Sequence, residues 1–139
     1  MKCQILAVLL FFTAFQVQPF TSALGQDSLR VSRQTPAKTK VQYGIASFYS
    51  NSFQGKKTSS GEIFSQKKMT AAHNTLPLGT YVRVTNLRNK RTVIVKINDR
   101  LHHRNKRLID LSRTAAERLG FIKSGTTRVK VEVLGKKPV

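Results

Sequence analysis

Short runs of alternating apolar and polar residues dominate the second half of the chain and indicate a mainly β fold. In the clearest run, Val129, Val131 and Val133 alternate with charged residues. A period of two places the valines on one face of a strand, toward a core. Segment 81–85 likewise places Val82 and Val84 on one face, and segment 92–97 is a denser run of β-branched residues. Turn-forming residues lie between these two segments and predict a hairpin.

Two helical pieces are predicted among these strands. Segment 112–119 is predicted as a helix, because Ser112 can cap its first turn, apolar residues recur every four positions and Gly120 can end it. A single helical turn is predicted at 69–73. With a further strand over 44–49, the pattern favours a small closed β-barrel with one or two short helices over a parallel α/β sheet.

The first 23 residues have the plan of a secretory signal peptide, with a positive start, an apolar run over 5–15 and small residues before a cleavage site. The run is shorter than the roughly 20 apolar residues that span a bilayer. We place cleavage after Ala23, with Gly25 as the alternative. The only cysteine, Cys3, precedes the run, where it cannot receive a lipid after cleavage. We therefore expect a periplasmic or secreted protein, not lipid-anchored and without stable membrane insertion.

The rest of the chain divides into three parts. Residues 24–42 are polar and basic without a sustained period, which is typical of a flexible linker. Residues 43–135 contain all the predicted strands and form one barrel domain, and residues 136–139 form a tail. Cleavage removes one lysine, so the formal net charge of +19 becomes +18. Such a charge favours an anionic partner, and export favours cell-wall polymer or membrane over nucleic acid.

The chain has six acidic residues, so each can be considered separately. Three of them have ordinary surroundings in the linker, on the predicted helix and on the polar face of the last strand. Glu62 follows a glycine in a loop, Asp99 ends a strand beside polar residues, and Asp110 lies between two apolar residues. Each has an ordinary alternative role: Glu62 offsets nearby lysines, Asp99 pairs with an arginine, and Asp110 bonds the backbone where the helix starts.

Histidines add one candidate for acid–base chemistry and no metal site. His73 precedes turn-forming residues, and a lone histidine is more often structural than catalytic. His102 and His103 are adjacent rather than three to five residues apart, as metal ligands usually are. Phosphate-binding loops, dinucleotide fingerprints and serine elbows do not occur in the sequence. We expect acid–base chemistry without a metal or a cofactor.

Seven segments in order and approximate spacing resemble the rare lipoprotein A family of lytic transglycosylases, and they cover nearly all of 43–134. They are GIASFY (44–49), TSSGE (58–62), MTAAH (69–73), LPLGT (76–80), VTNL (84–87), INDR (97–100) and IDLS (109–112). The resemblance implies a six-stranded double-psi β-barrel, as in expansins. It also implies an endolytic enzyme that cuts peptidoglycan glycan strands between N-acetylmuramic acid and N-acetylglucosamine and leaves 1,6-anhydro ends.

The same resemblance places Glu62, His73 and Asp99 at the catalytic positions. Asp99, kept protonated in a partly enclosed cleft, is expected to protonate the glycosidic oxygen and then to accept the proton of the muramic 6-hydroxyl. Asn98 and Arg100 are expected to position it. The other predicted substrate-binding residues are Thr58, Ser60, Asp110 and Tyr49, with Tyr49 either stacking on a sugar or serving as a core aromatic.

Departures from the family pattern keep two alternatives open. Leu101, His102 and His103 follow Asp99-Arg100 where the family usually has Gly-Pro, and Phe48 and Ser50 replace the common tryptophan and glycine. The first alternative is a noncatalytic, expansin-like wall-binding module. The second, a basic protein that attacks anionic membranes or binds nucleic acid, ranks last because no amphipathic basic helix is predicted. Expected partners are peptidoglycan glycan strands, and cell-wall or division proteins, but not nucleic acid.

Overall fold

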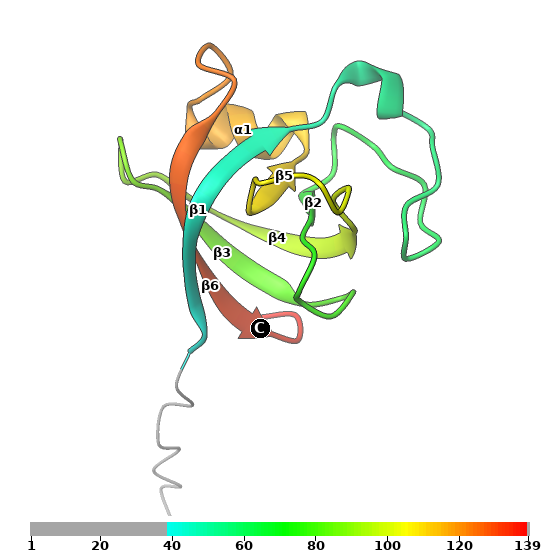
Figure 1. The fold of residues 1–139 in the computed structure, drawn as a ribbon, viewed down its shortest axis with the longest axis horizontal. Helices are drawn as coiled ribbons and strands as arrows, with labels where there is room; N and C mark the ends of the chain where they lie inside the picture. Colours follow the sequence, from blue (N-terminus) through cyan, green and yellow to red (C-terminus); the bar gives the residue numbers. More distant parts are fainter. Residues whose placement is uncertain (1–38, 139) are drawn as a thin grey trace, which may run out of the picture. The chain divides into compact units, whose positions relative to one another are not determined.

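The computed structural model describes residues 39–138, which form a closed six-stranded barrel with one α-helix (Figure 1). Around the barrel the strand order is β1-β5-β2-β4-β3-β6. β1 pairs with β5, and β2 with β4, in parallel, whereas the other four pairs are antiparallel. The predicted mainly β barrel is confirmed. The elements are β1 (Val41–Phe48), the 3-10 turn η1 (Asn51–Phe53), β2 (Thr70–Ala72), β3 (Tyr81–Asn86), β4 (Thr92–Asp99), β5 (Ile109–Leu111), α1 (Arg113–Leu119) and β6 (Thr127–Gly135).

The predicted hairpin and the predicted last strand form the antiparallel half of the barrel. β3 pairs with β4 so that Val82 faces Val95 and Val84 faces Val93. These inward valines and those of β6 are buried. Their alternation with exposed polar residues follows from a sheet that has its core on one side and solvent on the other.

The helical turn predicted at 69–73 is wrong, because Thr70–Ala72 forms strand β2. Ala71 lies opposite Ile97 of β4 and Leu111 of β5, so strands on both sides hydrogen-bond its backbone. All three residues of β2 are buried, as are those of β5. A short strand covered on both faces has no polar side, so its sequence shows no alternation.

Helix α1 forms as predicted. The Ser112 side chain accepts a hydrogen bond from the Ala115 N–H at 3.4 Å, and Gly120 ends the helix in the left-handed conformation with φ of 74°. Ala115 and Leu119 are fully buried in the core. Just after the helix, Phe121 contacts Phe48 edge-on, with ring centroids 5.9 Å apart.

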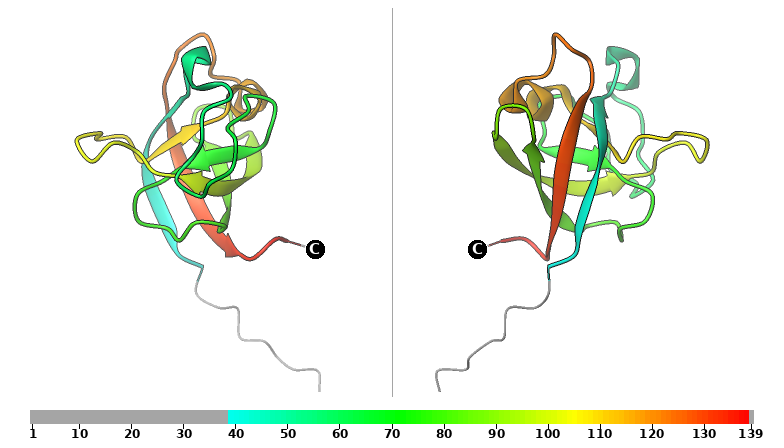
Figure 2. Two further views of the ribbon diagram at one scale, coloured as in Figure 1. Left: turned by 90° about the vertical axis from the view of Figure 1, so that its right-hand side faces the viewer. Right: turned by 60° about the vertical axis from the view of Figure 1, so that its left-hand side comes forward.

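Strand β1 begins at Val41, within the segment that the sequence assigned to the linker, and runs beside β6 (Figures 1 and 2). Gly44 of β1 allows a close approach, since a Cβ atom there would lie 2.6 Å from the Leu108 Cβ. Leu108 ends the loop between β4 and β5, residues 100–108, which projects from the barrel (Figure 2). This loop and the long segment between β1 and β2 carry the polar groups considered next.

The predicted signal peptide, residues 1–23, and residues 24–38 of the predicted linker lie outside the described residues. Within residues 39–138, we find no helix that is long and apolar enough to cross a membrane.

Candidate active site

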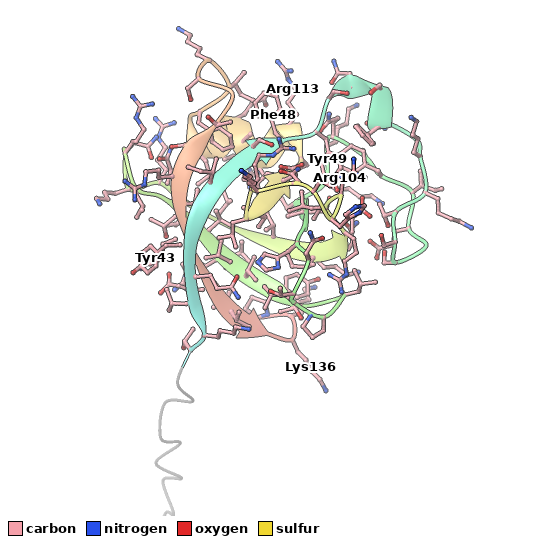
Figure 3. All side chains as sticks on the ribbon, viewed as in Figure 1. Tyr43, Phe48, Tyr49, Arg104, Arg113 and Lys136 are labelled. Atoms are coloured by element: carbon pink, nitrogen blue, oxygen red, sulfur yellow. The ribbon has the colours of Figure 1, made fainter. Side chains whose placement is uncertain are left out.

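A cleft of about 550 Å³ opens where the segment after β1 meets the loop between β4 and β5. Aromatic residues form one wall, and the basic β4–β5 loop forms another. Figure 3 shows Tyr49 and Arg104 on this side of the barrel. The lining residues used below are Ser47, Tyr49, Phe53, Asp99, Arg100, Leu101, His102, Arg107 and Asp110.

Asp99 lies at the end of β4, in the cleft, and its two carboxylate oxygens have different surroundings. Oδ1 accepts three hydrogen bonds: from the Ser59 N–H at 3.0 Å, the Ser59 hydroxyl at 2.8 Å and the Arg100 N–H at 2.8 Å. Oδ2 accepts one, from the Tyr49 hydroxyl at 2.8 Å. Oδ2 therefore has the greater remaining capacity to bond a substrate.

These donors keep Asp99 ionised. Burial is the largest single influence and raises the pKa of Asp99, but the donors from Ser59, Arg100 and Tyr49 together outweigh it, so the pKa lies below its usual value. The expectation that the cleft keeps Asp99 protonated is therefore wrong for the free protein. Enclosure was the only influence considered from the sequence; of the opposing hydrogen bonds, one comes from the adjacent Arg100 N–H and the rest come from Ser59 and Tyr49, which are remote in the chain.

Tyr49 acts on Asp99 through its hydroxyl rather than by offering a ring to solvent. Its ring is buried in a cluster with Phe64, Ala72 and Leu101. Burial, and then the hydrogen bond to Asp99, raise the pKa of Tyr49, so it remains a protonated donor. Phe53 does present an exposed ring to the cleft, and this ring contacts Tyr49 edge-on at 5.4 Å between centroids.

Glu62 fastens its own loop to the outer side of β4. Its carboxylate accepts hydrogen bonds from the Lys96 ammonium at 2.5 Å and the Asn98 amide at 2.9 Å. These two bonds, in that order of effect, lower the pKa of Glu62. The Ser60 N–H also bonds the Asn98 carbonyl at 3.1 Å. The loop is thereby held where Ser59 reaches Asp99.

Thr58 and Ser60 stabilise the same loop through hydrogen bonds within it. Thr58 is buried, and its hydroxyl lies 3.0 Å from that of Ser60. The Ser60 hydroxyl also accepts the N–H of Glu62 at 3.4 Å. Neither residue lines the cleft.

His73 is buried, neutral and does not line the cleft. Its Nδ1 accepts the N–H groups of Thr75 and Leu76, at 3.2 and 3.3 Å, so the proton lies on Nε2, 2.9 Å from the Gln42 amide oxygen. Burial first, then the charges of Arg100 and Lys40, lower the pKa of His73 to about 4. The ring organises the turn after β2.

Arg100 connects that turn to Asp99. Its guanidinium donates to the carbonyl oxygens of His73 and Leu76, at 2.5 and 2.7 Å, while its backbone N–H holds Asp99. His73 and Asp99 also share a backbone bond of 3.1 Å between the His73 N–H and the Asp99 carbonyl. The His73 ring therefore influences Asp99 only indirectly, through Arg100 and through this backbone hydrogen bond.

Asp110 forms a second polar cluster in the same cleft. Arg107 binds it with two hydrogen bonds, of 2.8 and 2.9 Å, and the Ser47 hydroxyl donates a third at 2.5 Å. This differs from the alternative in which Asp110 bonds the start of the helix, a position that Ser112 fills. Asp110 and Asp99 therefore lie in one cleft on separate hydrogen-bond networks.

The loop that departs from the family pattern is anchored rather than loose. Leu101 is buried in the cluster that contains the Tyr49 ring. The His102 and His103 rings stack with their centroids 4.3 Å apart, and His102 lines the cleft. The substitution of the usual Gly-Pro therefore adds an apolar anchor next to the residue that bonds Asp99.

The structure thus divides the predicted site residues into two groups. Asp99, Tyr49, Arg100 and Asp110 line the cleft, whereas the others support it from behind. Sequence reasoning missed Ser59, Phe53, Ser47 and Arg107; of these, only Ser59 and Ser47 fall within segments of the family resemblance. Residues 39–138 contain no cluster of three His, Cys, Asp or Glu side chains placed to hold a metal ion. The supporting residues are Thr58, Ser60, Glu62, His73 and Asn98.

Comparison with known proteins assigns the chain to a family. Residues 41–131 match the model of a family described as lytic transglycolase. The chain belongs to this family. Among curated family relatives, the endolytic peptidoglycan transglycosylase RlpA of Pasteurella multocida is 51% identical over 107 residues, which cover 77% of this chain and 36% of that protein. RlpA of Haemophilus influenzae is 50% identical over 98 residues, which cover 70% and 34%.

The matched part of this chain thus spans about a third of the length of these relatives. Solved structures agree on the barrel. An expansin of Clavibacter michiganensis has a TM-score of 0.55 at 22% identity, covering 72% of this chain and 52% of that one. A papain inhibitor of Streptomyces has the same TM-score at 20% identity, covering 68% and 94%. At such identities the likeness shows the double-psi fold alone.

Proposed function

We propose that this protein is an endolytic peptidoglycan lytic transglycosylase that cuts glycan strands between N-acetylmuramic acid and N-acetylglucosamine and leaves 1,6-anhydro ends. The observation that carries the proposal is the Asp99 carboxylate. It lies in a cleft, with one oxygen saturated by three donors and the other bonded only by Tyr49. Relatives about 50% identical are named for this activity.

The reaction needs one proton to move and one bond to be exchanged for another. The bond between muramic C1 and the glycosidic oxygen breaks, and a bond between C1 and the muramic 6-oxygen forms. The proton leaves the 6-hydroxyl and ends on the departing oxygen. A single carboxylate can carry it, accepting the proton from one oxygen and delivering it to the other as an oxocarbenium-like centre develops.

Asp99 suits this relay because it starts ionised. Oδ2 accepts the 6-hydroxyl proton, and the Tyr49 hydroxyl keeps the carboxylate oriented during the transfer. Water does not act as the nucleophile. Phe53 provides an exposed ring on which a sugar can stack beside the reacting residue. Glu62 and His73 act as positioning residues, through the Ser59 loop and Arg100 respectively.

Two parts of the proposal concern the protein's surroundings. Residues 1–23 direct export, so that the barrel meets its substrate in the periplasm or outside the cell; determining the N-terminal residue of the exported protein would test this. The glycan strand is the main partner. Cell-wall or division proteins are further expected partners, which affinity capture from cross-linked cells would test.

The decisive experiment compares the wild-type protein with Asp99→Asn and with Glu117→Gln. The amide is nearly the same size as the carboxylate and retains an acceptor for Ser59 and Arg100. Glu117 is an exposed carboxylate on α1, so its substitution controls for the loss of one negative charge. Each protein is incubated with sacculi and with glycan strands stripped of stem peptides, and anhydro-ended fragments are measured by mass spectrometry.

We expect wild-type protein and Glu117→Gln to release such fragments. Asp99→Asn should cleave at least 100-fold more slowly, because general acid–base groups usually accelerate a reaction by about 10² to 10⁴-fold. If Asp99→Asn cleaves as fast as wild type, the assignment of Asp99 is wrong. If wild-type protein pellets with sacculi but cleaves neither substrate, the protein is a wall-binding module and the enzyme proposal fails.

A further inference from the structure

A second surface of the barrel, remote from the cleft, has the composition of a polymer-binding face. We define the outer face as the solvent side of three adjacent strands, β1, β6 and β3. Its side chains form rows because the strands are in register. Opposite one another lie Ile45 and Arg128, Tyr43 and Lys130, and Val41 and Glu132; β3 adds Thr85 beside Lys130 and Arg83 beside Glu132.

An exposed apolar stripe runs along β1 on this face. Tyr43 is 68% exposed, Val41 41% and Ile45 39%. Side chains two residues apart on a strand are separated by about 7 Å, so the stripe is roughly 14 Å long. Figure 3 shows Tyr43 projecting from the outer side of β1, away from the side that carries Tyr49 and Arg104. The outer face is therefore separate from the cleft.

A row of cations runs next to the stripe on β6. Arg128 and Lys130 lie on the neighbouring strand, roughly 5 Å away in the hydrogen-bonding direction. Glu132 is the one acidic residue of the outer face, and Lys130 pairs with it at 3.4 Å. Within residues 39–138, Arg128 and Arg83 form no ion pair. The face thus carries cationic charge that no acidic residue of the described part of the chain neutralises.

The surface beside Tyr43 is concave. A hollow of about 290 Å³ lies between Tyr43 and Ile45 on one side and Leu87 and Arg128 on the other. Leu87 is held there by a 2.9 Å hydrogen bond from its N–H to the Arg128 carbonyl. A hollow that combines an aromatic ring with a guanidinium suits a sugar unit that carries a carboxylate.

We propose that the outer face is a second, noncatalytic binding surface for an acidic polysaccharide strand lying along β1 and β6. The strand's sugar faces contact Tyr43 and Ile45, and its carboxylates meet Arg128. A linear stripe flanked by a parallel row of cations matches an extended polymer. A bilayer surface would instead favour an amphipathic helix with a basic polar face, whereas the outer face consists of strands. The identity of the polymer rests on the proposed function, since the substrate there is also an acidic glycan.

The experiment separates binding from cleavage. The full chain and the variants Tyr43→Ala, Tyr43→Phe, Arg128→Ala and Lys67→Ala are pelleted with sacculi across a range of salt concentrations. Lys67 is an exposed cation of the segment between β1 and β2, off the outer face, and so controls for the loss of one positive charge. The same proteins are assayed for cleavage of short soluble glycan fragments, which reach the cleft without spanning the outer face.

We expect Tyr43→Ala to weaken pelleting about fivefold and Arg128→Ala about threefold, while Tyr43→Phe and Lys67→Ala stay near wild type. The Arg128 effect should shrink at high salt, because exposed charges are then screened. Cleavage of short fragments should be unchanged in all four variants. Asp99→Asn should pellet like wild type. This pelleting pattern supports the proposal that the outer face binds the wall even if wild-type protein cleaves nothing. In that case only the proposed function fails.

Three results would overturn the proposal. Pelleting of Tyr43→Ala and Arg128→Ala equal to that of wild type would show that the outer face does not bind the wall. Binding to vesicles containing anionic lipid that is stronger than pelleting and depends on the same two residues would identify a membrane surface. A dimer in sedimentation velocity that dissociates on Tyr43→Ala would show that a second copy covers the face.

Discussion

Acidification is predicted to destabilise the barrel through His73. The ring is 1% exposed, and its Nδ1 is committed as an acceptor to two backbone N–H groups. Burial and nearby cations lower the pKa of His73 from 6.5 to about 4 in the folded protein. As the pH falls below 6.5, His73 therefore becomes protonated in the unfolded chain but stays neutral in the folded protein, and the equilibrium shifts toward unfolding. The stabilisation is complete above pH 6.5 and lost progressively toward pH 4.

The size of the effect follows from these two pKa values. Each pH unit between them costs about 1.4 kcal/mol of folding free energy. Between pH 7 and pH 4.5, His73 should therefore remove about 2 kcal/mol, a substantial part of the 5–15 kcal/mol that is typical of a domain. Urea unfolding, followed by circular dichroism at pH 7, 6, 5 and 4.5, measures the loss.

His73→Asn is the matched control for this measurement. The asparagine Oδ1 can take the place of Nδ1 as acceptor for Thr75 and Leu76, whereas the titrating ring is gone. The other histidines, His102 and His103, are present in both proteins and cancel in the comparison. Whatever its stability at pH 7, the variant should lose about 2 kcal/mol less than wild type on acidification to pH 4.5. Equal losses in the two proteins would refute the assignment of a buried, neutral His73.

Three further outcomes follow from side chains around the cleft and the helix. Tyr49→Phe keeps the ring and removes one hydrogen-bond donor to Asp99, so the pKa of Asp99 should rise and the acid limb of the pH–rate profile should move to higher pH. Cleavage should slow about tenfold, which is equivalent to about 1.4 kcal/mol. An unchanged profile would contradict this role of Tyr49. Asn86→Ala removes a buried amide that bonds the Leu119 carbonyl and the Thr127 hydroxyl, and should lower the free energy of unfolding in urea by about 2 kcal/mol. Asn89 donates to the same carbonyl from a more exposed position, so Asn89→Ala should lower it by under about 1 kcal/mol. Leu101→Ala should cost about 2 kcal/mol and slow cleavage, because it removes the anchor beside the Tyr49 ring; unchanged stability would show that this cluster does not hold the loop.

The amount of fold that can be predicted from this sequence depends on how each strand is covered. β3, β4 and β6 have the core on one face and solvent on the other, so their sequences alternate and identify them. β2 and β5 are three residues long and buried throughout. The sequence pattern predicts a helical turn where β2 lies and no strand where β5 lies. Their conformation is decided by pairing with strands distant in sequence, which a local pattern does not contain.

The site shows the same division between local and remote information. Asp99 is predictable because it ends a strand among polar residues, where a sheet delivers side chains to a cleft. Its ionisation is not predictable, because the hydrogen-bond donors from Ser59 and Tyr49 that counteract burial lie 40 and 50 residues earlier in the chain. Phe53 likewise becomes a cleft residue only when the segment after β1 folds over the end of β4.

In the proposed reaction, the position of Asp99 between two opposing influences would let one group both accept and deliver a proton. In the free protein, donors on Oδ1 and Tyr49 on Oδ2 outweigh burial and keep the carboxylate ionised. A glycan strand bound there as proposed would exclude water from Oδ2 without adding a cation, and so would strengthen burial, the influence that already favours the protonated form. The carboxylate thus becomes a stronger base as the 6-hydroxyl approaches it. Once protonated, it loses part of the benefit of the three Oδ1 donors, which favour the anion, and so it readily passes the proton to the departing oxygen.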